Sequence, residues 1–195
     1  MIIGFDADQD CSDVATDAVD AGAEFVCRYL KNLSIAEANA LSAAGLRIVS
    51  IFETTAHRAL AGAAAGKEDG TFALAQSLSL KQPVATAICA TADFDVTLTQ
   101  QPAVLAYFTA FKAAIADMKL MVYANGAICQ ATLDSGIADY TWLAGGKAMR
   151  GSREFLASGR ATIVQDVGDK AGLDLGIDID SDTATVAEYG GWYLT

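Results

Sequence analysis

Acidic residues follow several short apolar segments of this sequence, and carboxylates in such places can transfer protons. Asp6 follows residues 1–5, Glu53 follows residues 46–52, and Asp93 and Asp95 come at the end of the apolar segment 84–92. Alternation along an extended chain puts Asp93 and Asp95 on one side. Two close carboxylates repel each other's charge, so one keeps its proton near neutral pH, and a protonated carboxyl beside an ionised one suits cleavage of a glycosidic bond. The candidate catalytic residues are Asp6, Glu53, Asp93 and Asp95.

Aromatic and polar side chains stand at the ends of the other apolar segments. The rings of Tyr29, Tyr123 and Trp142 offer flat faces on which sugars can stack, although core packing explains any one of them equally well. The candidate substrate-binding residues are Arg28, Tyr29, Tyr123, Trp142, Gln165 and Asp178. His57, the only histidine, follows Glu53 by four positions, and we interpret it as a loop or helix-start residue.

These residues need a scaffold that brings them together, and the pattern of the chain predicts one. Strands are expected at residues 1–5, 24–29, 46–52, 84–92, 120–124, 139–143, 161–165 and 176–179. Helices are expected between them at residues 12–21, 71–80, 101–118 and 127–135, and after the capping box that starts at Ser34, with Gly45 as the stop. Strands alternating with helices predict a parallel sheet, and eight such units favour a closed barrel.

The predicted fold class is therefore α/β: one compact (β/α)₈ barrel of TIM type over residues 1–195, with short or missing late helices. In such a barrel the active site lies at the C-terminal ends of the strands. We therefore expect Asp6, Glu53, Asp93, Tyr123, Gln165 and Asp178 to point into one cleft.

Charge and motifs exclude several classes of function. The net charge of −11 argues against binding nucleic acid or anionic lipid. The chain has no GxGxxG after its first strand and no P-loop motif, so a nucleotide cofactor is not expected. One histidine and four scattered cysteines argue against a zinc site. Asp178 and Asp180 resemble metal ligands in spacing, but this pattern is too short to assign a metal, and we expect no metal or cofactor.

Short motifs in a fixed order resemble one family. They are Gly4-Phe5-Asp6, residues 25–30, residues 43–49 before Glu53, Ala92-Asp93-Phe94-Asp95, residues 122–126, residues 140–144, Val164-Gln165 and Ile177-Asp178-Ile179-Asp180. The sequence resembles the glycoside hydrolase-like (β/α) barrels of uncertain activity from actinobacterial secreted proteins and phage or bacterial cell-wall lytic proteins, distant relatives of the family 25 lysozymes. This resemblance implies a barrel that holds peptidoglycan or a related wall polymer.

The resemblance also exposes a departure at the fourth strand. Family 25 lysozymes carry Asp-x-Glu there, with the Glu as proton donor, whereas this chain has Asp95 at that position. The side chain of Asp is one methylene shorter, which leaves Glu53 as the other candidate donor. The leading hypothesis is a lysozyme-like or endolysin-like glycosidase that acts on cell-wall glycan by carboxylate acid/base catalysis.

Two alternatives stay open. A carbohydrate-binding barrel without turnover is compatible with the departure at Asp95. The other is a barrel hydrolase of other chemistry, acting on phosphate esters or through a metal. A basic cluster after the last two strands would favour it, but the sequence has acidic residues such as Asp166 and Asp174 there.

The N-terminus leads directly into a strand, without a basic segment and a removable apolar one. No apolar run is long enough to span a bilayer. We expect a soluble monomer with no signal peptide in this chain, whose partner is the glycan itself. Phage lysis or an export system would then bring it to the cell wall.

The cysteines give the first testable prediction. Cys11, Cys27, Cys89 and Cys129 show no CxxC pair, and a chain of this length builds a core without disulfides. Thiol titration of the unfolded protein without reductant should therefore find four reactive groups. Finding two or none would reveal disulfides and contradict this expectation.

Overall fold

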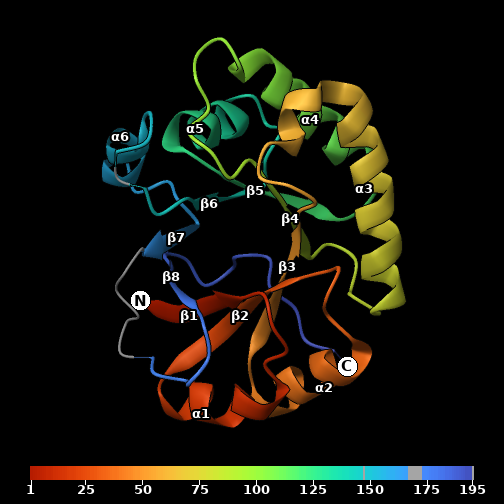
Figure 1. Ribbon diagram of the computed structural model, residues 1–195, viewed down its shortest axis with the longest axis vertical. Helices are drawn as coiled ribbons and strands as arrows, with labels where there is room; N and C mark the ends of the chain where they lie inside the picture. Colours follow the sequence, from red (N-terminus) through yellow and green to blue (C-terminus); the bar gives the residue numbers. More distant parts are fainter. Residues whose placement is uncertain (147, 167–172, 195) are drawn as a thin grey trace.

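The computed structural model describes residues 1–146, 148–166 and 173–194, and its centre is a closed barrel (Figure 1). The strands are β1 (Ile2–Ala7), β2 (Ala23–Tyr29), β3 (Arg47–Phe52), β4 (Ala87–Thr91), β5 (Lys119–Ala124), β6 (Tyr140–Leu143), β7 (Ile163–Asp166) and β8 (Asp180–Ala184). They follow each other around the barrel in chain order, and β8 closes onto β1. The predicted single (β/α)₈ barrel is confirmed.

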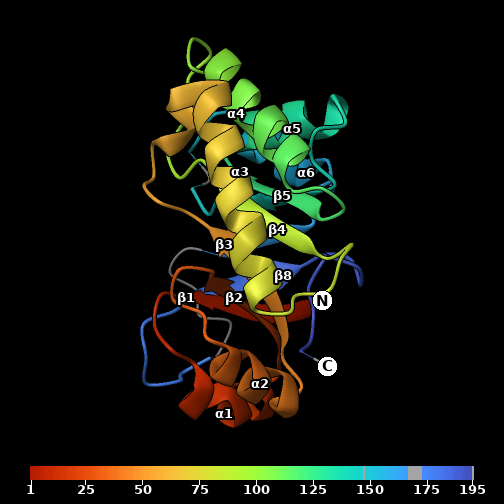
Figure 2. The same cartoon turned by 90° about the vertical axis from the view of Figure 1, so that its right-hand side faces the viewer.

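Helices cover the outside of the barrel on two sides. They are α1 (Ala15–Asp20), α2 (Ile35–Ala44), α3 (Gly62–Ser79), α4 (Gln101–Ala114), α5 (Gly126–Asp134) and the short α6 (Ser152–Ala157), with 3-10 turns η1 (Ser12–Val14) and η2 (Arg58–Ala61). Figures 1 and 2 agree that α1 and α2 lie together on one side, while α3, α4 and α5 lie on the other. No helix in the described ranges has the length and apolarity to cross a membrane.

The last strand differs from the prediction in place and in direction. Residues 176–179 are not a strand; β8 begins at Asp180 and runs antiparallel to both β7 and β1. All other neighbouring strands pair in parallel. An antiparallel strand brings its N-terminal end, rather than its C-terminal end, to the mouth of the barrel. The inward-facing residues near the start of β8 therefore reach the site.

Local signals placed most helix ends correctly. The Ser34 side chain accepts a hydrogen bond from the Glu37 backbone N–H at 3.0 Å, and Gly45 ends α2 in the left-handed region at φ 100°. One helix start was wrong: α3 begins at Gly62, nine residues before the predicted start at residue 71. The glycines that obscured it, Gly66 and Gly70, are buried where α3 lies against α4, and a Cβ at either would collide with the backbone of α4.

The barrel has an inner and an outer core. Phe25, Val49, Met121 and Trp142 fill the interior, whereas the outward-facing side chains of the strands pack beneath the helices. All four cysteines are free and buried, in agreement with the sequence. Every residue of β4 is buried, as expected for a parallel strand covered on both faces.

A buried ion pair joins the first two β/α units. The Arg28 Nε donates to Glu37 Oε1 at 2.6 Å, and both side chains have no exposed surface. Arg28 also donates to the Ala7 carbonyl, and Glu37 Oε1 accepts from the Cys11 N–H at 3.0 Å. The pair thus fixes β2, the end of β1, the start of η1 and the first turn of α2 with respect to one another.

Removing one member of this pair should be costly. Glu37→Gln leaves the Arg28 charge buried without a counter-charge, so we expect the free energy of unfolding to fall by about 3–5 kcal/mol. Urea denaturation measures the change. Glu24→Gln on the exposed side of β2 is the matched control, expected within about 0.5 kcal/mol of the parent. Equal effects of the two substitutions would show that the buried pair has no special role.

Candidate active site

One pocket of about 330 Å³ opens at the mouth of the barrel. Seven of the ten residues predicted for the site line it: Asp6, Tyr29, Glu53, Asp93, Tyr123, Trp142 and Gln165. They come from β1, β2, β5, β6, β7 and the segments that follow β3 and β4. The structure therefore brings together side chains that are up to 159 positions apart in the chain.

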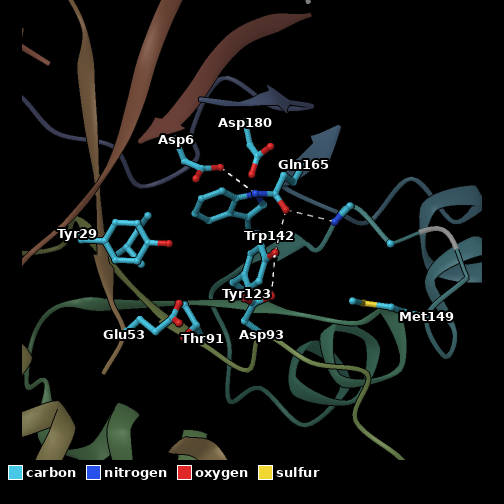
Figure 3. A pocket seen from close by; sticks show the side chains of 13 residues that line it. Asp6, Tyr29, Glu53, Thr91, Asp93, Tyr123, Trp142, Met149, Gln165 and Asp180 are labelled. Atoms are coloured by element: carbon cyan, nitrogen blue, oxygen red, sulfur yellow. Dashed lines mark hydrogen bonds between the residues drawn. The ribbon is translucent and has the colours of Figure 1, made fainter. Parts of the chain in front are cut away.

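Carboxylates lie on two sides of this pocket (Figure 3). Asp6 and Asp180 form one pair because they are directly opposite each other in the β1–β8 register. Glu53 and Asp93 form the other pair on the far side of the pocket. Burial, followed by the charge of Asp93, raises the pKa of Glu53. A ligand in the pocket thus has a carboxylate pair on either side of it.

Gln165 and Tyr123 connect the two sides. The Gln165 Nε2 donates to Asp6 Oδ2 at 2.8 Å, and its Oε1 accepts from the Tyr123 hydroxyl at 2.8 Å. The same hydroxyl lies 3.4 Å from Asp93 Oδ1. A hydroxyl has one proton to donate, so Tyr123 serves Gln165 in this arrangement. The carboxylate of Asp93 is exposed and stays available to a ligand.

Burial changes the ionisation of Asp6. Its pKa rises from the ordinary 3.8 to about 7, chiefly because the side chain is removed from water and secondly because Asp180 is negatively charged, while the hydrogen bond from Gln165 opposes the rise. A carboxyl of this pKa is largely protonated just below neutral pH and can donate a proton. Asp6 therefore has the ionisation that a general acid requires.

Asp182 lies beneath Asp6 inside the barrel and was not predicted from the sequence. It is fully buried, and neither carboxylate oxygen has a hydrogen-bond partner within the described ranges. Burial, followed by the charge of Asp6, raises the pKa of Asp182 well above its usual value. An ionised carboxylate in this position would be very costly, so Asp182 holds a proton at neutral pH.

Three predicted residues do not line the pocket. Arg28 is paired with Glu37 inside the fold, so no part of its side chain is exposed to a ligand. Asp178 precedes β8 and lines a neighbouring hollow of about 250 Å³, which shares Asp6, Tyr29 and Asp180 with the pocket. Two expectations are therefore corrected: Arg28 was predicted to bind substrate, and Asp178 was predicted to point into the same cleft as Asp6.

Asp95 is the third predicted residue that does not line the pocket, and its side chain binds a neighbouring loop. Its Oδ1 accepts from Asn125 Nδ2 and from the backbone N–H of Arg150, each at 2.8 Å. Asn125 caps α5, and Arg150 ends the segment that brings Met149 into the pocket wall. Asp95 thus stands outside the pocket and positions part of its wall.

The wall also contains residues not predicted for the site: Ile51, Thr91, Gly145, Gly146, Met149 and Asp180, of which the sequence singled out only Asp180, for its spacing from Asp178. Asp182, below the wall, was not predicted either. Asp178, Asp180 and Asp182 alternate along the chain, so they share one face of an extended segment. The direction of β8 decides which of them reaches the mouth, and the alternation carries no information about that direction. Over the described part of the chain, no three His, Cys, Asp or Glu residues are grouped to hold a metal ion.

The closed barrel and its carboxylate-lined pocket are those of a glycoside hydrolase-like domain. Residues 18–184 match the family described as "Rv2525c-like, glycoside hydrolase-like domain". The chain belongs to this family, in agreement with the resemblance seen in the sequence. No curated protein matches the chain significantly.

Solved structures share the fold at low identity. The Tat-secreted protein Rv2525c of Mycobacterium tuberculosis, in complex with L-tartrate, has a TM-score of 0.81 and 21% identity over 98% of each chain. An uncharacterized B. stearothermophilus protein has a TM-score of 0.71 and 18% identity, covering 94% of this chain and 96% of that one. The catalytic domain of endolysin ply40 from bacteriophage P40 of Listeria monocytogenes has 0.60 and 14%, covering 94% and 93%.

The raised pKa of Asp6 predicts a dependence of stability on pH. Between about pH 4 and pH 7 the folded protein binds a proton at Asp6 that the unfolded chain has released, so the free energy of unfolding falls as the pH rises through this range. Asp182 acts in the same direction. Asp6→Asn should therefore flatten the decline, as measured by urea denaturation at a series of pH values. A variant that declines as steeply as the parent would show that Asp6 titrates normally.

Proposed function

We propose that this domain is a glycosidase that cleaves bacterial cell-wall glycan by carboxylate acid/base catalysis. The observation that carries the proposal is the pair of carboxylates on either side of the pocket, one of them with a pKa of about 7. Glycoside cleavage needs a proton donor on one side of the scissile bond and an ionised carboxylate on the other. Asp6 and Asp93 meet these two requirements.

In this mechanism Asp6 gives its proton to the glycosidic oxygen as the bond to the anomeric carbon breaks. The ionised carboxylate of Asp93 either attacks the anomeric carbon or takes a proton from the water that does so. Glu53 adds negative charge that stabilises the developing positive charge on the sugar ring. Tyr29 and Tyr123 contact the sugar, and Gln165 keeps the Asp6 carboxyl in place through its amide hydrogen bond.

The comparisons support the choice of glycan. The catalytic domain of a phage endolysin shares the fold, and the family is glycoside hydrolase-like. The similarity to a Tat-secreted protein supports action outside the cytoplasm. Peptidoglycan is therefore the substrate to test first, with the domain acting as a lytic enzyme.

One observation favours a second candidate, a barrel that binds glycan without cleaving it. Asp95 occupies the position of the proton donor of family 25 lysozymes, but two hydrogen bonds at 2.8 Å hold it outside the pocket. If Asp6 cannot replace that donor, the pocket binds sugar without turnover. Incubation with purified peptidoglycan separates the candidates, because only a glycosidase releases fragments with new reducing ends.

Asp93→Asn tests the assignment of the ionised carboxylate. We expect release of reducing ends to fall by at least about 100-fold. The melting temperature should stay equal or rise, because Asp93 is exposed, its carboxylate lies 3.4 Å from the Tyr123 hydroxyl, and Glu53 repels it. Asp20→Asn at the end of α1, an exposed carboxylate away from the mouth, is the control and should keep full activity. A fully active Asp93→Asn protein, or one that melts far below the parent, would contradict the assignment.

A further inference from the structure

The pocket is small for a polymeric ligand. Its volume of about 330 Å³ lies at the lower end of the range for small-molecule sites. A cell-wall glycan must therefore leave the pocket and run over the rim of the barrel. On the side of β1 and β8 the hollow that contains Asp178 continues the pocket. The opposite rim is formed by the segments that follow β3 and β4.

A stacked pair of rings, of which one is exposed, stands on this opposite rim. The imidazole of His57 stacks on the ring of Phe94, with the centroids 4.5 Å apart and the planes 24° from parallel. Their segments are joined by a hydrogen bond from the Asp93 N–H to the Ala56 carbonyl at 3.2 Å. Phe94 directly follows Asp93, a residue of the pocket wall, so the pair lies next to the pocket.

The two rings differ in exposure. Phe94 is half-buried and packs on the outer core of the barrel, whereas His57 is exposed. The imidazole is therefore supported from below by a fixed aromatic ring and presents its other face to solvent. The backbone holds it there too, because His57 caps η2 and its carbonyl accepts from the Leu60 N–H at 3.0 Å.

We propose that His57, supported by Phe94, is an outer sugar subsite on which a pyranose ring of the glycan stacks beyond the pocket. The C–H groups on one face of a pyranose form a flat apolar surface that matches an exposed aromatic ring. The subsite lies beside Asp93, so a chain bound in the pocket and leaving over β3 and β4 crosses it. This inference rests on the proposed function, since the ligand of both sites is one glycan chain.

A purely structural His57 would behave differently. If stacking on Phe94 served only to pack the loop, loss of the imidazole would weaken short and long ligands alike through a change in the loop. A subsite outside the pocket instead contributes only to ligands long enough to reach it. The dependence on ligand length separates the two roles.

The test is calorimetric titration of soluble peptidoglycan glycan fragments, from disaccharide to hexasaccharide, in the Asp93→Asn background to suppress cleavage. His57→Ala should weaken binding of the hexasaccharide by roughly three- to tenfold and leave the disaccharide unchanged. His57→Phe keeps a flat ring and should restore the affinity for long fragments. Tyr193→Ala, which removes an exposed ring whose hydroxyl donates to the Gly45 carbonyl just before β3, at the end of the barrel away from the mouth, is the matched control and should change neither.

Other results of this titration would overturn either the subsite alone or the proposed function together with the subsite. Equal weakening of disaccharide and hexasaccharide, or no effect of His57→Ala on either, overturns the subsite and leaves the proposed function standing. Failure of the parent to bind a fragment of any length, together with no release of reducing ends from peptidoglycan by the unmodified protein, overturns the proposed function and the subsite with it.

Discussion

β8 runs antiparallel to both of its neighbours, and the chemistry of the mouth depends on this direction. The register places Asp180 opposite Asp6 and Asp182 opposite Gly4, so three carboxyl groups gather on two adjacent strands. Burial raises the pKa of Asp6 to about 7, and the charge of Asp180 adds to this rise. The direction of β8 therefore contributes to the proton that Asp6 keeps near neutral pH, because it brings Asp180 opposite Asp6. A parallel β8 would have put the other end of that strand at the mouth.

The fold buries charge in two contrasting ways. On the side of α1 and α2, Arg28 and Glu37 neutralise each other, and backbone groups satisfy their remaining hydrogen-bonding positions. Inside the barrel, Asp182 has no cationic or hydrogen-bonding partner among the described residues, and it is neutral because it keeps its proton. The first arrangement stabilises the scaffold. The second keeps a proton on a buried carboxyl directly under the group proposed to donate a proton.

The sequence predicted the scaffold well because local signals determine it. Period and composition located seven of the strands, and the cap at Ser34 with the stop at Gly45 fixed α2. Convergence of Asp6, Glu53, Asp93 and Gln165 followed from barrel geometry alone. Arg28 and Asp95 were misplaced because their partners, Glu37 and Arg150, come from separate helices and loops, and no local pattern shows which way a polar side chain turns. The direction of β8 depends on pairing with β1, more than 170 positions earlier in the chain. The local sequence at residues 176–179 therefore does not indicate that the last strand is antiparallel.

Gly66 and Gly70 set how closely α3 approaches α4, and this outer contact bears on the mouth of the barrel. Any side chain at these positions would force α4 away from α3. The segment from β4 to α4 contains Asp93, Phe94 and Asp95, so a displaced α4 would pull on the residues that line and border the pocket. A substitution at Gly66 or Gly70 would therefore reach the mouth by a mechanical route through the chain, although neither α3 nor α4 lines the pocket.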